Sequence, residues 1–348
     1  MAVRLQDIAD RLGISVATVS RALGGYSDIS LATRQRVLQA AQEAGYRPNV
    51  VARMLQKQRT DTIGFIVPTH GPRFSDPFFS ELFAGIGNKA TEAGFDLLVS
   101  THPPGPAEME AYKRLVMERR VDGVLVVRTR RQDPRLAYLL EQDFPVVAFG
   151  RSELDGDFPY VDVDGKVGMH LLIEHLVSLG HRRIALISPP PDFLFTYWRL
   201  EGYRECLQEH GIEYREELVK GGTLTERGGY DAGMQLLTMP VPPTAIAACN
   251  DLMALGVTSA AQTLGLTVGQ DVAVTGFDDV PLAEHAHPPL TTVRQPIYQI
   301  GQRICDMLIR LLQDKPLTER HVMLEPELIV RVSCGAPGTQ VQKGGSTI

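Results

Sequence analysis

The sequence predicts a small all-α head followed by a larger α/β body built on two doubly wound parallel sheets. Three observations support this fold class. Apolar residues recur at helical spacing over residues 5–45, short apolar runs alternate with helical patterns from residue 62 onward, and that alternation repeats in the second half of the chain. A length of 348 residues fits two or three domains, and 44% hydrophobic residues are ample for buried cores.

Residues 5–25 predict two short helices joined by a tight turn. The first helix has an apolar face, Gly13 ends it, and Ser15 is a good N-cap for the second. This is the layout of a helix-turn-helix whose second helix enters the DNA major groove, and an ordinary helical hairpin is the alternative. The residues expected to contact DNA in this segment are Leu5, Ser15, Val16, Ala17, Thr18, Ser20 and Arg21.

The expected DNA contacts differ in their chemistry. Val16 and Ala17 are apolar and can contact thymine methyl groups, although Val16 could instead pack inward. Thr18 and Ser20 suit phosphates. Arg21 has the reach for either a guanine edge or a phosphate.

A third helix and a short fourth helix are expected next. Ser30 can cap the third helix, which ends at Gly45. Its apolar side is expected to hold Leu31, Val37, Leu38 and Ala41. Asn49 can cap a helix at 50–57 that is too short to be stable alone in water, and a polar linker follows it.

Charge is distributed unevenly along the chain. Residues 1–60 contain nine Lys and Arg against four acids, a net of +5, whereas the whole chain has a net charge of −6 and the remainder therefore −11. A basic head on an acidic body indicates that only the head meets a polyanion such as DNA.

The body predicts two successive βαβα series. Buried strands are expected at 63–67, 96–100, 123–127 and 145–149, and in the second series at 160–163, 183–188, 245–249 and 272–277. Sheets of this kind bind ligands at the carboxyl ends of their strands. Two facing halves therefore predict a ligand site in a cleft between them.

The order of several motifs identifies a family. They are SVATVSRAL and GYRPNVVARMLQKQRTDTIGFIVP near the N-terminus, then LGHRRIALI (179–187), RLEGY (199–203), ACNDLMALG (248–256), VAVTGFDD (272–279) and PPLTTVRQP (288–296). Over nearly its whole length the chain resembles the LacI/GalR family of bacterial transcription regulators. The resemblance implies a periplasmic-binding-protein-like body that senses an effector.

The resemblance also implies a division of the chain. We expect a helix-turn-helix domain at 1–47, a hinge helix and linker at 48–61, an N-subdomain at 62–161 and 293–323, a C-subdomain at 162–292 and 324–335, and a disordered tail at 336–348. The tail has no leucine heptads, so a homodimer is expected rather than a tetramer.

For DNA, the resemblance implies that two heads of a homodimer read a pseudo-palindromic operator. Hinge helices from the two protomers would pair in the minor groove, where Leu55 wedges into a central CG step and kinks the duplex. The further hinge contacts implied are Asn49, Ala52 and Arg53.

For the effector, the resemblance implies a set of polar residues in the cleft. They are Asp76, Arg199, Asn250 and Asp278, with Leu224 where an aromatic residue is usual. The nearby Phe78, Phe195 and Trp198 could stack on a sugar ring or belong to the core instead. An Arg–Asn–Asp set with aromatic rings suits a neutral polyol, so we expect a mono- or disaccharide. A purine or other non-sugar effector is the alternative, and inducer and corepressor action both stay open.

Other classes of protein fit less well. A periplasmic sugar carrier would share the body, but it has no use for a basic head and requires a signal peptide, of which the sequence shows none. With no run of 18 apolar residues and four scattered cysteines, we expect a cytoplasmic protein without a membrane partner.

No metal site, cofactor or catalytic residues are expected, so the chain is not predicted to be an enzyme. Gly85, Gly87 and Ala90 match a loose nucleotide fingerprint but lie inside a helical pattern.

Overall fold

The computed structural model describes residues 3–24, 26–46, 59–69 and 76–335, and the chain divides into two compact units at Arg59. The expected tail and the expected hinge residues, Asn49, Ala52, Arg53 and Leu55, lie outside the described residues. Each unit is described by itself below.

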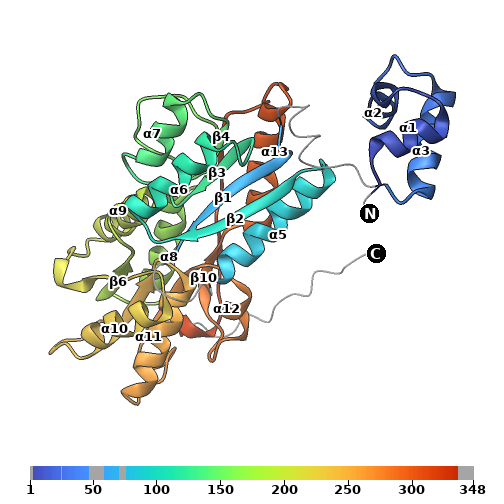
Figure 1. The fold of residues 1–348 in the computed structure, drawn as a ribbon. Helices are drawn as coiled ribbons and strands as arrows, with labels where there is room; N and C mark the ends of the chain where they lie inside the picture. The colour runs from blue at the N-terminus through green and yellow to red at the C-terminus, as the bar shows by residue number, and fades with distance from the viewer. Residues whose placement is uncertain (1–2, 25, 47–58, 70–75, 336–348) are drawn as a thin grey trace. The chain divides into compact units, whose positions relative to one another are not determined.

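The first unit contains the expected helices in its described residues. They are α1 (Leu5–Leu12), α2 (Val16–Leu23) and α3 (Leu31–Glu43) (Figure 1). Gly13 ends α1 with a φ of 66°, a conformation that costs glycine little. The Ser15 and Ser30 hydroxyls accept hydrogen bonds from the backbone N–H groups of Thr18 (3.1 Å) and Thr33 (3.2 Å), so both predicted N-caps are confirmed.

The core of this unit is small and partly different from the expected one. Its buried members are Ile8, Ala9, Val19, Ala22, Val37, Ala40 and Ala41. The expected apolar side of α3 is wrong in two positions, because Leu31 is 75% exposed and Leu38 is 49% exposed. Ala40 takes the place of Leu38, since positions 37, 40 and 41 lie on one helical face.

In the second unit, the first sheet has the order β11-β5-β4-β3-β1-β2 in its described residues, and all its strands pair in parallel. The strands are β1 (Thr62–Pro68), β2 (Asp96–His102), β3 (Gly123–Val127), β4 (Val146–Phe149), β5 (Tyr160–Val163) and β11 (His321–Leu324). The helices α5 (Pro77–Glu92) and α13 (Ile297–Leu312) cover one face, and α6 (Pro106–Met117) and α7 (Pro134–Glu141) cover the other (Figure 1).

The second sheet has the order β12-β10-β9-β8-β6-β7 in the described part of the chain, with β12 antiparallel at one edge. The strands are β6 (Ile184–Ser188), β7 (Val219–Gly221), β8 (Ala245–Ala248), β9 (Ala273–Asp278), β10 (Thr291–Arg294) and β12 (Glu327–Ile329). The helices of this half are α8 (Gly165–Ser178), α9 (Leu194–Glu209), α10 (Glu226–Leu237), α11 (Asp251–Thr263) and α12 (Pro281–His285). The predicted fold class of two mainly parallel sheets is therefore confirmed.

The chain crosses between the two sheets after β5, after β10 and after β11. The expectation that 160–163 begins the second series is wrong, because β5 pairs with β4 and β11 in the first sheet. The expected crossings at 161/162, 292/293 and 323/324 each lie one or two residues too early. The chain leaves each sheet later than expected because β5, β10 and β11 stay paired with a neighbouring strand up to their last residues. In β10, for example, Arg294 still pairs with Asp278 of β9.

A close helix contact explains Gly85, one of the two glycines that resemble a nucleotide fingerprint. A Cβ atom on Gly85 of α5 would lie 2.2 Å from the carbonyl oxygen of Tyr298 in α13. Reciprocally, a Cβ on Gly301 would lie 2.4 Å from the carbonyl oxygen of Leu82. Gly85 therefore serves helix packing, and no phosphate-binding turn is formed there.

Candidate functional site

A cavity lies between the two sheets of the second unit, where strand ends from both halves converge. Its empty space, including a part that is open solvent, is about 740 Å³. All eight effector residues expected from the sequence line it: Asp76, Phe78, Phe195, Trp198, Arg199, Leu224, Asn250 and Asp278. Residues 62–163 contribute the first two, and the second half of the unit contributes the others.

Asp76 and Asn250 also hold the local structure. Asp76 caps α5, where its carboxylate accepts from the Phe78 backbone N–H at 3.1 Å. Asn250 caps α11, because its side-chain oxygen accepts from the Met253 N–H at 2.9 Å. The Asn250 amide also donates to the Leu224 carbonyl at 3.2 Å, which leaves one N–H of this amide for a ligand.

Arg199 is the central cation of the C-subdomain side. It projects from α9, is 6% exposed, and its guanidinium lies 3.6 Å from the ring centroid of Phe277. One Nη donates to the Cys249 carbonyl, and the other lies 3.9 Å from the Asp278 carboxylate. The Arg199 guanidinium is held in one orientation because it is buried between the Phe277 ring and the Cys249 carbonyl.

Asp278 ends β9 and accepts a hydrogen bond of 2.6 Å from the Gln295 amide. Burial raises the pKa of Asp278 to about 7, although Arg199 opposes the shift. The neighbouring Asp251 is also buried, which raises its pKa well above the ordinary value, and it accepts from the Thr292 hydroxyl at 2.6 Å. Burial therefore makes both carboxyl groups weaker acids than an exposed aspartic acid.

The structure adds charged and polar residues that the sequence analysis missed. Arg128 follows β3 and donates to Asp76 at 2.7 Å, and Arg151 follows β4 and donates to Asp162 at 2.7 Å. Gln295 follows β10 and also lines the cavity. Arg128 and Gln295 are the first residues after their strands, and Arg151 is the second residue after its strand. Because ligands bind at the carboxyl ends of parallel strands, these three residues could have been found from the sequence, whereas Asp162 lies within a strand.

In the described part of the lining, three cations are matched by three carboxylates. Arg128 pairs with Asp76, Arg151 with Asp162, and Arg199 with Asp278. With every pair ionised, the described lining residues carry no net charge. Arg151 in addition lies 4.6 Å from the ring centroid of Trp198, so a residue of the first half contacts α9 across the cavity.

Two buried donors of the lining have no hydrogen-bond partner among the described residues. They are the indole Nε1 of Trp198 and the Nε of Arg199. Buried polar groups are almost always hydrogen-bonded, because leaving one unpaired costs about 1–3 kcal/mol. Two unpaired donors in one cavity therefore point to a ligand that carries hydrogen-bond acceptors.

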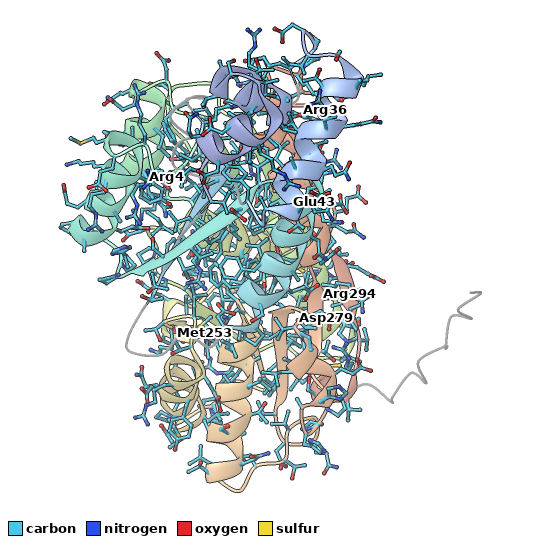
Figure 2. The ribbon with its side chains drawn as sticks, turned by 45° about the vertical axis from the view of Figure 1, so that its right-hand side comes forward. Arg4, Arg36, Glu43, Met253, Asp279 and Arg294 are labelled. Atoms are coloured by element: carbon cyan, nitrogen blue, oxygen red, sulfur yellow. The ribbon has the colours of Figure 1, made fainter. Side chains whose placement is uncertain are left out.

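Asp279, the residue after Asp278, forms ion pairs with two arginines. Arg294 donates to Asp279 at 2.7 Å, and both residues are labelled in Figure 2. Asp279 also pairs with Arg331 at 2.8 Å.

No group of three or more His, Cys, Asp or Glu suited to a metal ion occurs in the described ranges, and no described helix is long and apolar enough to cross a membrane.

In the head, the expected DNA contacts lie at or near α2. Ala17 and Arg21 are exposed, and Thr18 and Ser20 are half-buried. Leu5 and Val16 are partly buried against the head core, so the inward packing that was left open for Val16 is present in part. The Ser15 hydroxyl is occupied by the helix cap and by the Thr18 hydroxyl at 2.8 Å.

Comparison with known proteins agrees with both units. The family described as bacterial regulatory proteins, lacI family, matches residues 4–49, and the periplasmic binding protein-like domain matches residues 173–334. The HTH-type transcriptional regulator AglR of Rhizobium meliloti (strain 1021) is 36% identical, over 99% of this chain and 100% of its own. The chain belongs to the LacI family.

Solved structures extend the likeness of this LacI-family regulator to its fold. The lac repressor dimer bound to operator and the anti-inducer ONPF has a TM-score of 0.83 and 29% identity, covering 96% of this chain and 99% of that one. The CelR–cellobiose complex has a TM-score of 0.71 and 35% identity, covering 95% and 99%. The chain is thus a DNA-binding transcriptional regulator, and its relatives are regulators rather than enzymes.

Proposed function

We propose that this LacI-family regulator binds a neutral sugar, a mono- or disaccharide, in the cavity between its subdomains, and that the sugar controls operator binding. The observation that carries the proposal is the pair of unpartnered buried donors, Trp198 Nε1 and Arg199 Nε. Sugar hydroxyl and ring oxygens are acceptors that fit such donors.

Charge favours a neutral ligand. Each guanidinium that the structure describes in the lining already faces a carboxylate, at 2.7 Å for Arg128 and Arg151 and at 3.9 Å for Arg199. An anion would have to displace a carboxylate from its cation, and a cation would lack a free carboxylate. A polyol can bind to the outer oxygens and N–H groups of these pairs without adding charge to a buried site.

The apolar lining favours a ligand with ring faces. Phe78 and Phe149 stack at 6.0 Å between centroids on one wall, and Phe195 lies on α9 in the other half of the unit. Flat apolar surfaces of this kind pack against the C–H faces of a sugar ring. The cellobiose of the related CelR complex supports a disaccharide in particular.

Sugar binding would act by a shift between arrangements of the two subdomains. Residues of both halves line the cavity, so a ligand that contacts both favours one arrangement over another. In a cytoplasmic homodimer on a pseudo-palindromic operator, that arrangement would decide whether the hinge segments can pair on DNA. By linkage, sugar and operator must change each other's affinity by the same factor.

Binding assays can test the proposal directly. Trp198 is the only tryptophan of the chain, so its fluorescence reports on the cavity of the full-length protein. A panel of mono- and disaccharides is compared with purine bases and nucleosides, and hits are added to a gel shift on DNA upstream of the gene. Saturable binding of a sugar that changes the gel shift is expected. Binding of a purine alone would contradict the proposal.

Variants locate the binding site. Trp198→Leu removes one donor and part of an apolar wall, and calorimetry should show sugar affinity roughly tenfold weaker. Arg199→Ala should abolish the sugar response while operator binding is retained. Arg227→Ala is the control, because that side chain is 79% exposed and outside the cavity lining. Equal effects of all three variants would show that the cavity is not the sugar site.

A further inference from the structure

Arg21 of the recognition helix is contacted by two side chains of the loop between α2 and α3. Its Nη2 forms an ion pair with the Asp28 carboxylate, and its guanidinium lies 5.6 Å from the ring centroid of Tyr26. Neither loop residue was singled out by the sequence motifs. Both are exposed, as Arg21 is, so all three lie at the surface that carries the recognition helix.

The loop is tied to both helices, and these ties place Tyr26. The Tyr26 N–H donates to the Arg21 carbonyl at 3.1 Å, and the Arg34 guanidinium of α3 donates to the Tyr26 carbonyl at 2.6 Å. A Cβ atom on Gly24 would lie 2.9 Å from the Tyr26 ring. The absence of a side chain at Gly24 therefore lets the ring lie close to the end of α2.

The ion pair is too exposed to matter much for stability. The Arg21 and Asp28 side chains are 50% and 47% exposed, and exposed ion pairs contribute little to the free energy of unfolding. What the pair and the ring do supply is orientation. A guanidinium has five N–H donors in one plane, and a carboxylate on one Nη leaves donors of that plane available for a ligand.

The orientation of the Arg21 guanidinium matters more for a contact to a guanine base than for a contact to a phosphate. A phosphate can be bound from many directions, and an adjacent carboxylate would repel it. A guanine edge requires two coplanar donors aimed at O6 and N7, and it is not an anion. An Arg with a carboxylate beside it is therefore better suited to a base than to a phosphate.

We propose that Asp28 and Tyr26 are positioning residues that hold the Arg21 guanidinium for bidentate recognition of one guanine in each operator half-site. This resolves the choice between phosphate and base that the sequence left open for Arg21. Asp28 also places a negative charge beside the DNA-facing helix, which weakens binding to DNA of unrelated sequence.

The test uses the full-length protein and a library of duplex DNA with randomised half-sites. Wild type is expected to enrich a half-site containing one guanine whose replacement costs roughly 5- to 150-fold in affinity, the range of a good bidentate contact. Arg21→Ala should lose that preference. Asp28→Asn should reduce it at the same base position by roughly 2- to 12-fold, the cost of ordering a long side chain on binding.

Two further variants separate positioning from charge and from folding. Asp10→Asn changes the charge of the head equally, at an exposed residue that accepts from Gln6 at 2.7 Å, and should raise non-specific affinity without changing the base preference. Tyr26→Leu should weaken the same guanine preference as Asp28→Asn. Circular dichroism checks that each head keeps its helix content.

Three results would overturn the proposal. Arg21→Ala could retain the guanine preference, or Asp28→Asn could select the wild-type half-site with unchanged discrimination. Alternatively, Asp28→Asn could lose a preference at a different base from the one lost in Arg21→Ala, which would mean that Asp28 contacts a base itself.

Discussion

Arg135→Met should be among the most destabilising single changes in the body, because Arg135 is the centre of a buried charge cluster. The side chain is 1% exposed, and its partners Glu108 and Asp133 are fully buried. It donates to Glu108 at 2.8 Å, to the two Asp133 oxygens at 2.9 and 2.6 Å, and to the Arg128 carbonyl at 3.0 Å. Arg130 completes the cluster with a 2.6 Å hydrogen bond to Glu108.

The magnitude follows from what the substitution leaves behind. With Arg135 the cluster has two guanidinium and two carboxylate groups, and without it one buried negative charge is uncompensated. Glu108 keeps Arg130, and Asp133 keeps the backbone N–H groups of residues 130 and 135 at 2.9 and 3.0 Å. Breaking a buried ion pair from one side costs about 3–5 kcal/mol, and methionine fills most of the volume, so we expect a loss in this range.

Urea unfolding followed by circular dichroism measures the change in the free energy of unfolding. Arg227→Met is the matched control, because Arg227 pairs with Asp231 at 2.9 Å while 79% exposed, and it should change stability by about 0–1 kcal/mol. If Arg135→Met lay within about 1 kcal/mol of wild type, the reasoning from burial would be refuted. Because the cluster holds the loop after β3, the variant should also weaken effector binding through Arg128.

Two other predictions concern pH and the hinge. Burial raises the pKa of Asp278 to about 7, so the folded protein binds more protons than the unfolded chain from about pH 4 to pH 7, and the free energy of unfolding should fall as pH rises through that window. Asp278→Asn should reduce this slope in thermal unfolding at pH 5 and pH 8, because Asp251 has a raised pKa as well and contributes a slope of the same sign; an unchanged slope would assign it wholly to other groups. Leu55→Ala should weaken specific operator binding in a gel shift while sugar affinity stays nearly unchanged, because the resemblance places Leu55 in the DNA wedge, and equal loss of both would contradict that division of roles.

Much of the fold was predictable because its signals are local. Ser15, Gly13 and Ser30 act on groups within three or four residues along the chain, and the structure uses them as predicted. The strand and helix alternation of the body is equally local. The residues at which the chain crosses from one sheet to the other were not predictable. The strands β5, β10 and β11 differ from their neighbours only in which sheet they join.

The candidate site shows the same division. Asp76, Arg199, Asn250 and Asp278 could be placed from motifs, and all line the cavity. Their partners could not be placed so, because the pairing of Arg128 with Asp76 joins residues 52 positions apart.

The sequence by itself determined that a basic helical head precedes an acidic two-sheet body, and it indicated the family and the residues that line the cavity. Only the tertiary structure decided which charges neutralise one another, which donors stay unpaired, and that Arg21 lies against Asp28 and Tyr26. The physical reason is that helix caps and strand patterns depend on near neighbours, whereas the electrostatics of a site depend on chain segments that meet only in the folded protein.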